Sequence, residues 1–179
     1  MMAWRTPIRL LTSLLCGALL WPAAARAGGA VVGRPAPLFR LKTFTGKTVT
    51  TYSLRGKPAV LVVGRSRKAA PPCKDWMLKV YKVLGDKKIH LYQVIVLDNP
   101  WYLPRGLVRG KVKGFVPKGH LHRVLLEWKI AFARIFGIPK HNLPTIFVLD
   151  RKGVVRLRHK GKLSKAAWAK TKKVLAALK

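Results

Sequence analysis

Runs of apolar residues separated by polar turns predict a chain that alternates between strands and helices. Consecutive apolar residues such as AVLVV are typical of strands buried on both faces. Alternation of apolar and polar residues, as in VVRLRH, predicts a strand with one buried face, on which Val155 and Leu157 lie opposite Arg156 and Arg158. Strands are expected at 35–43, 48–54, 59–63, 89–97, 145–150 and 154–159.

Apolar residues three and four positions apart predict three helices. The first begins at about Pro72 and buries Trp76 and Val80, and the last begins at Ser164, whose side chain suits an N-cap. A middle helix is expected at 121–136, and the Pro- and Gly-rich stretch 98–119 is expected to be a loop. A hairpin followed by βαβαββα predicts an α/β fold with a central mixed sheet flanked by helices.

The N-terminus carries the three parts of a secretory signal. Arg5 and Arg9 precede an apolar run, and a small-x-small ending follows at Ala25 and Ala27. We therefore expect a signal peptide at 1–27 and one exported domain at 28–179, in the periplasm or cell envelope. An uncleaved membrane anchor is less favoured, because the apolar run is shorter than the roughly 20 residues that span a bilayer.

Charge is the most unusual feature of the composition. The chain has 37 Lys and Arg against 5 Asp and Glu, for a formal net charge of +32. Such a protein attracts polyanions. Cations around Trp101 and Tyr102 interleave with aromatic residues as in single-strand nucleic-acid sites. For an exported protein, however, we expect an anionic envelope polymer or lipid surface as the partner, and nucleic acid is not expected.

Cysteine usage leaves one thiol in the expected mature domain. Of the 2 cysteines, Cys16 lies within the signal and Cys73 lies in the stretch KAAPPCKDW. A single thiol cannot form an internal disulfide. Cys73 therefore pairs with another molecule, stays free, or serves only in packing.

Three motifs in this order resemble the thioredoxin superfamily, and more closely its exported redoxin branch of periplasmic thiol-disulfide oxidoreductases and peroxiredoxin relatives. VGRPAPLFRL with TGKTVTTYSLRGKPAVLVV is similar to the entry of that branch. KAAPPCK is similar to its WCGPCK or WCPPCK, and NLPTIFVLDRKG is similar to its cis-proline segment. The resemblance implies a thioredoxin-like fold with an N-terminal β-hairpin.

The same resemblance assigns roles to single residues. Cys73 matches the second cysteine of the family's pair, and Ala70 replaces the first, which attacks the substrate disulfide. Pro144 matches the cis-proline, and Leu143, Pro144 and Pro72 are the candidate substrate-binding residues. The resemblance implies no cofactor and no metal site, since the superfamily's copper-binding proteins use a cysteine pair.

Three roles remain open for Cys73. A reactive thiol would form mixed disulfides with a protein thiol partner, whereas an inert thiol would only fill the core. A one-cysteine peroxidase is less favoured, because Ser66 and Ala70 stand where peroxiredoxins keep Pro and a hydroxyl residue. The expected function is an exported redoxin acting through Cys73; the alternative is a noncatalytic thioredoxin-fold module that binds a protein or an anionic envelope polymer.

Overall fold

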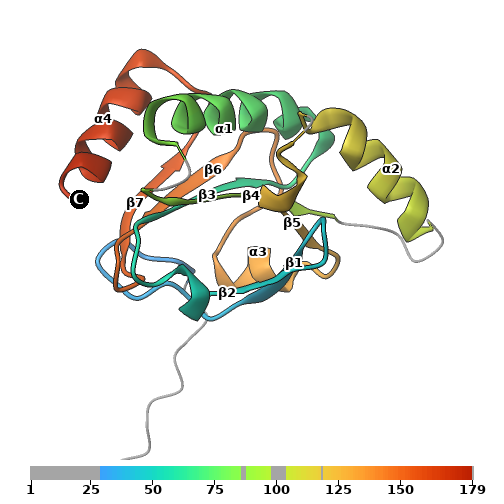
Figure 1. Cartoon of the computed structure of the whole chain (residues 1–179), viewed down its shortest axis with the longest axis horizontal. Coiled ribbons are helices and arrows are strands. Elements are labelled where there is room, and N and C mark those ends of the chain that lie inside the picture. Colours follow the sequence, from blue (N-terminus) through green and yellow to red (C-terminus); the bar gives the residue numbers. More distant parts are fainter. Residues whose placement is uncertain (1–28, 86–87, 98–103, 118, 179) are drawn as a thin grey trace, which may run out of the picture.

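The computed structural model describes residues 29–85, 88–97, 104–117 and 119–178 as strands, helices and connecting turns (Figure 1). The strands are β1 (Arg40–Thr43), β2 (Thr48–Thr50), β3 (Ala59–Gly64), β4 (His90–Val96), β5 (Val124–Glu127), β6 (Thr145–Leu149) and β7 (Val155–Lys160). The helices are α1 (Ala70–Leu84), α2 (Arg105–Phe115), α3 (Ala131–Ile135) and α4 (Lys165–Ala176), with single 3-10 turns η1 (Tyr52–Leu54), η2 (Arg67–Ala69) and η3 (Leu121–Arg123).

The strands form a seven-stranded mixed sheet in the order β2-β1-β5-β4-β3-β6-β7. Its centre is parallel, with β4 between β3 and β5, while β1-β2 and β6-β7 are antiparallel hairpins at the two edges. β6 also pairs antiparallel with β3. The predicted α/β thioredoxin-like fold, with its N-terminal hairpin, is confirmed.

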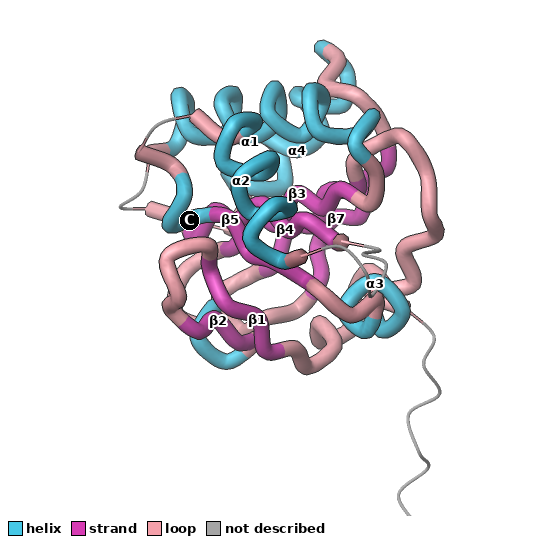
Figure 2. Tube along the Cα trace, turned by 90° about the vertical axis from the view of Figure 1, so that its right-hand side faces the viewer, coloured by secondary structure: helices cyan, strands magenta, loops and turns pink. Residues whose placement is uncertain are grey.

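Helices cover both faces of the sheet. α4, α1 and α2 lie along one face, and the short α3 lies on the other (Figures 1 and 2). Strand β3 shows how the sequence supplies both layers: Val60 and Val62 pack with α1 and α4, while Leu61 and Val63 pack with Phe132 and its neighbours. A strand buried on both faces must be apolar throughout, which is why β3 reads as a continuous apolar run.

The C-terminal predictions are confirmed in detail. Val155 and Leu157 of β7 are buried, whereas Arg156 and Arg158 are exposed. The Ser164 hydroxyl accepts a hydrogen bond from the Ala167 backbone N–H at 3.1 Å and so caps α4.

The helix predicted at 121–136 is wrong. This segment is instead divided among η3, β5 and α3. All four residues of β5 are buried between β1 and β4, so VLLE is a short buried strand with an apolar run that also fits helical spacing. Apolar runs of this length do not distinguish a buried strand from a helix by periodicity alone.

The loop predicted at 98–119 is also wrong in its second half, where α2 forms. Val108 and Val112, four residues apart, pack with Val124 and Leu126 of β5. Gly106, Gly110 and Gly114 would ordinarily weaken a helix. Packing of Val108 and Val112 on β5 outweighs the low helix propensity of these three glycines, beside which the space is open.

The predicted signal peptide and residues Trp101 and Tyr102 lie outside the described part of the chain. Within the described ranges, none of the helices combines the length and the apolar character needed to span a bilayer.

Candidate thiol site

Cys73 lies in the first turn of α1 and is completely buried. Its sulfur packs against the end of β3, where a Cβ added to Gly64 would lie 3.0 Å from the Sγ atom. Glycine at position 64 therefore leaves the space that the sulfur occupies. This complement to Cys73 was not identified from the sequence, in which Gly64 only marks the end of an apolar run.

Burial makes Cys73 a poor nucleophile. Desolvation raises the pKa of its thiol from 9.0 to about 12. Roughly one thiol in 10⁵ would then be ionised at pH 7, and the thiolate is the form that attacks disulfides and peroxides. The cationic residues nearby in sequence do not offset this desolvation.

Ala70 occupies the first position of α1, one helical turn before Cys73. Its side chain is half-buried, whereas Cys73 lies below it in the core. A thiol at the first position would face the positive end of the helix dipole, which stabilises a thiolate. Alanine offers no such group.

The residues between them shape the same helix start. Pro71 and Pro72 follow Ala70 within the first turn, where proline is tolerated because the backbone N–H groups there lack helical partners. The Ser66 hydroxyl accepts a hydrogen bond from the Ala69 N–H at 3.2 Å. Ser66 therefore caps the turn that leads into α1, at the position where a peroxiredoxin would have proline.

Arg65 connects the end of β3 to the segment that precedes Pro144. Its Nη1 donates a 2.6 Å hydrogen bond to the Ile138 carbonyl oxygen, while its Nε is buried without a partner among the described residues. The guanidinium thus fixes the 138–144 loop beside the start of α1 and is itself only partly satisfied.

Leu143 and Pro144 lie at the entry to β6, as the resemblance requires, but with different local geometry. No peptide bond among the described residues is cis, so the expectation of a cis bond before Pro144 is wrong for this structure. That expectation rested on the resemblance alone, and an X-Pro bond is trans in most cases by default. Pro144 is buried, and its carbonyl oxygen accepts a hydrogen bond from the Gly161 N–H at 3.0 Å.

His141 occupies the backbone N–H of Leu143, one of the candidate substrate-binding residues. Its Nδ1 accepts a hydrogen bond from the Leu143 N–H at 3.2 Å, and its Nε2 lies 3.5 Å from the Thr145 hydroxyl. Burial, and then the positive charge of Lys160, lowers the pKa of His141. The ring is therefore neutral near pH 7 and suited to accept the Leu143 hydrogen bond.

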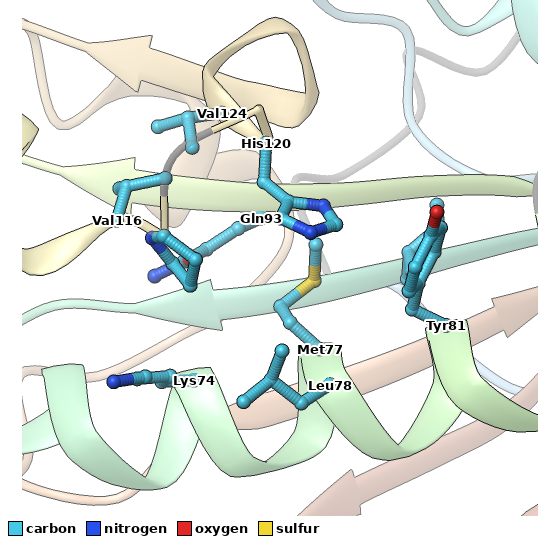
Figure 3. Close-up of a pocket in the computed structure, with 10 residues that line it drawn as sticks. Lys74, Met77, Leu78, Tyr81, Gln93, Val116, His120 and Val124 are labelled. Atoms are coloured by element: carbon cyan, nitrogen blue, oxygen red, sulfur yellow. The ribbon is translucent and has the colours of Figure 1, made fainter.

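A pocket opens beside the thiol site, between α1 and the segment that follows α2 (Figure 3). Its volume is about 20 Å³, which is room for about one water molecule. The lining residues include Lys74, Leu78 and Tyr81 of α1, together with Val116 and His120. The His120 and Tyr81 rings lie edge to face there, with their centroids 4.8 Å apart.

A larger cavity, of about 330 Å³, lies at the N-terminal ends of the parallel strands β3 and β4. It is lined by Pro58, Leu84, Ile89 and Leu175, with Lys88 and Arg151. Pro58 and Ile89 directly precede β3 and β4, whereas the thiol site follows the end of β3. The cavity is therefore separate from Cys73.

Internal hydrogen bonds occupy two of the three described carboxylates. Both oxygens of the buried Glu127 accept 2.8 Å bonds, from the Lys129 and Phe132 N–H groups at the start of α3. Asp150 accepts hydrogen bonds from the backbone of the β6-β7 turn and forms an ion pair with Arg156 at 2.7 Å. Asp75 is the remaining described carboxylate, and it is exposed on α1.

Comparisons with known proteins agree with this geometry. The chain matches the family model described as Redoxin over residues 31–178. No curated protein matches it. Among solved structures, it is similar to a putative thiol:disulfide interchange protein DsbE from Chlorobium tepidum, at 25% identity and a TM-score of 0.64, covering 84% of this chain and 100% of the other.

Two further structures share the fold at lower identity. The exposed lipoprotein thioredoxin Etrx1 from Streptococcus pneumoniae is 21% identical, with a TM-score of 0.58 and coverage of 76% of this chain and 98% of the other. A putative thioredoxin from Neisseria meningitidis is 23% identical, with a TM-score of 0.59 and coverage of 80% of this chain and 91% of the other.

The described residues hold one cysteine, Cys73, and so no cysteine pair. The family match covers nearly all of the described residues, and the sheet topology agrees with it. The chain therefore belongs to the redoxin family and is related to the thiol-disulfide oxidoreductases.

Proposed function

We propose that this protein is an exported, noncatalytic thioredoxin-fold module that binds an anionic partner, either an acidic envelope polymer or an anionic lipid surface. One observation carries the proposal: every described lysine is exposed, whereas Asp75 is the one exposed carboxylate of the described chain. The three carboxylates in that part of the molecule are too few to neutralise its positive charge. Such a surface attracts polyanions over distances set by the Debye length.

The state of the thiol supports a noncatalytic role. The position that the resemblance gives to the attacking cysteine is Ala70, and Cys73 is buried with a raised pKa. The resemblance makes Leu143 a candidate substrate-binding residue, but its backbone N–H already donates to His141. A surface site therefore has better support than a peptide bound beside Pro144.

Retention on an immobilised sulfated polysaccharide such as heparin tests the anionic-partner proposal. We expect strong retention at low salt that falls steeply as salt is added, because exposed charges are screened over about 10 Å at 0.1 M ionic strength. A neutral agarose matrix is the control. Retention that is the same at low and high salt would contradict electrostatic binding.

A mixed disulfide with a protein thiol is the second candidate function. What favours it is that Cys73 lies in the first turn of α1, where local opening would expose the sulfur to the helix dipole. Alkylation with iodoacetamide at about pH 8 tests it. We expect Cys73 to be labelled only after the protein is unfolded in urea, and rapid labelling of the folded protein would instead favour the thiol partner.

A further inference from the structure

The outer side of α2 differs from the rest of the basic surface because it also exposes large apolar side chains. Leu107 is 62% exposed and Phe115 is 54% exposed. With Lys111 they are spaced four residues apart, so the three lie along one stripe of the helix. Exposed apolar side chains next to cations are the groups by which protein surfaces bind an anionic membrane interface.

The inner side of α2 is fixed to the fold, so this stripe is held outward. Val108 and Val112 pack with β5. Two cationic side chains add to this anchor: the Arg105 guanidinium lies 5.3 Å from the centre of the Trp128 ring, and that of Arg109 lies 4.6 Å from the centre of the Phe44 ring. The Arg109 Nη2 also donates a 2.8 Å hydrogen bond to the Phe44 carbonyl oxygen.

Neighbouring residues extend the same surface. The space beside Gly106, Gly110 and Gly114 is open, so a flat partner can approach the helix backbone. The first half of α1 and the segment after α2 line one pocket, to which α1 contributes the exposed Lys74 and Leu78 (Figure 3). Figures 1 and 2 show α2 at one edge of the layer formed by α4, α1 and α2.

We propose that this surface, defined by Leu107, Lys111 and Phe115 of α2 with Lys74 and Leu78 of α1, docks on an anionic phospholipid bilayer. Leu107 and Phe115 would insert at the level of the acyl-chain boundary, while Lys111 extends along them toward lipid phosphates. The described part of α2 carries no carboxylate that would repel lipid phosphates. On α1, Lys79 follows Asp75 by four residues, so a positive charge lies on the same side of the helix as this carboxylate. Charge and apolar exposure thus select the same partner, a surface that is anionic outside and apolar beneath.

This inference rests on the proposed binding of an anionic partner and narrows that partner to a lipid bilayer. The protein is purified as its expression host processes it, and vesicles of about equal parts phosphatidylglycerol and phosphatidylcholine are compared with phosphatidylcholine alone. Hydrogen exchange followed by mass spectrometry reports protection of 105–115 separately from every other segment. We expect protection of that segment with anionic vesicles and none with neutral vesicles.

Matched variants distinguish vesicle binding through α2 from nonspecific binding through any exposed apolar side chain. Leu107→Ser with Phe115→Ser should weaken vesicle binding by about tenfold or more, since two large apolar side chains no longer leave water. Leu38→Ser with Tyr52→Ser is the control, because these residues are equally exposed, at 63% and 58%, but lie near the β1-β2 hairpin. Equal losses in both variants, or unchanged protection of 105–115 in the α2 variant, would overturn the assignment.

The charge of the surface is tested in the same way. Lys74→Gln with Lys111→Gln should lower binding several-fold more than Lys172→Gln with Lys173→Gln on α4, which removes the same charge elsewhere. Salt-sensitive retention on heparin without vesicle binding would overturn the bilayer inference and leave the proposed function intact. Absence of both heparin retention and vesicle binding would contradict the proposed function and the bilayer inference together.

Discussion

The start of α1 and the outer side of α2 lie on the same face of the sheet but differ in almost every physical property. At the start of α1, Cys73 is completely buried and Trp76 is held by the core. On α2, Leu107 and Phe115 are exposed between cations. The first region has alanine where the resemblance expects the attacking cysteine, while the second exposes cations and large apolar side chains on one helix.

This difference separates a region that the core holds in place from one that is open to solvent. The start of α1 packs against β3, so its residues contribute to stability even without thiol chemistry. The outer side of α2 contributes little to packing and is therefore free to carry charge and apolar groups for a partner. Function in such a chain is better sought on the open surface than at the closed helix start.

The largest expected contrast between the two regions is in stability. Trp76 is completely buried, and its Nε1–H donates a 3.1 Å hydrogen bond to the Gly161 carbonyl oxygen. Trp76→Ala should lower the free energy of unfolding by about 3–5 kcal/mol. Leu107→Ala, measured by the same urea titration, should change it by less than about 0.5 kcal/mol. A comparable loss in both variants would mean that α2 is part of the core.

Alkaline pH sharpens the contrast through the thiol itself. In the unfolded chain Cys73 ionises near pH 9.0, but in the folded protein its pKa is raised to about 12. The folded state therefore binds more protons than the unfolded state in this range, so stability falls as pH rises through it, by about 1.4 kcal/mol per pH unit. Stability below pH 9 is unaffected by this group.

Cys73→Ala isolates that contribution from the many lysines, which titrate in both proteins. Urea unfolding between about pH 8 and 10.5 should show wild type losing about 2 kcal/mol more than the variant. Parallel pH curves for the two proteins would show that Cys73 is exposed to solvent in the folded state.

A smaller effect is expected where α2 is anchored. Arg109→Met keeps most of the apolar stem but loses the contact with the Phe44 ring and the hydrogen bond to its carbonyl. We expect a loss of about 0.5–1.5 kcal/mol, seen as faster hydrogen exchange in 105–115. Lys113→Met, which alters an exposed side chain, should have little effect. If Lys113→Met accelerates exchange as much, the arginine contacts do not hold the helix.

The sequence predicted most elements because their signals are local. The hairpins, the apolar run of β3 and the Ser164 cap each appear within a few residues. It failed at 121–136 because β5 pairs with strands that are distant in the chain, and four buried residues in a row have no distinctive period. It failed at α2 because glycine and proline predicted a loop, whereas packing of Val108 and Val112 on β5 outweighs propensity.

The candidate site was predictable in part for the same reason. Alanine at position 70 and the charge of the chain are properties of the sequence itself, and the order of motifs is sufficient to predict the thioredoxin-like fold. The space left by Gly64, the hydrogen bond from Leu143 to His141 and the trans bond at Pro144 depend on contacts between separate segments. No local pattern encodes them.

By itself, then, the sequence determined that this protein is a positively charged chain with a thioredoxin-like fold, in which Cys73 has no second cysteine close by in its motif. Only the tertiary structure decided that Cys73 is buried under α1 and that cations and apolar side chains are exposed together on α2. The physical reason is that ionisation and accessibility depend on desolvation by residues far apart in the chain, whereas charge and residue identity are fixed position by position.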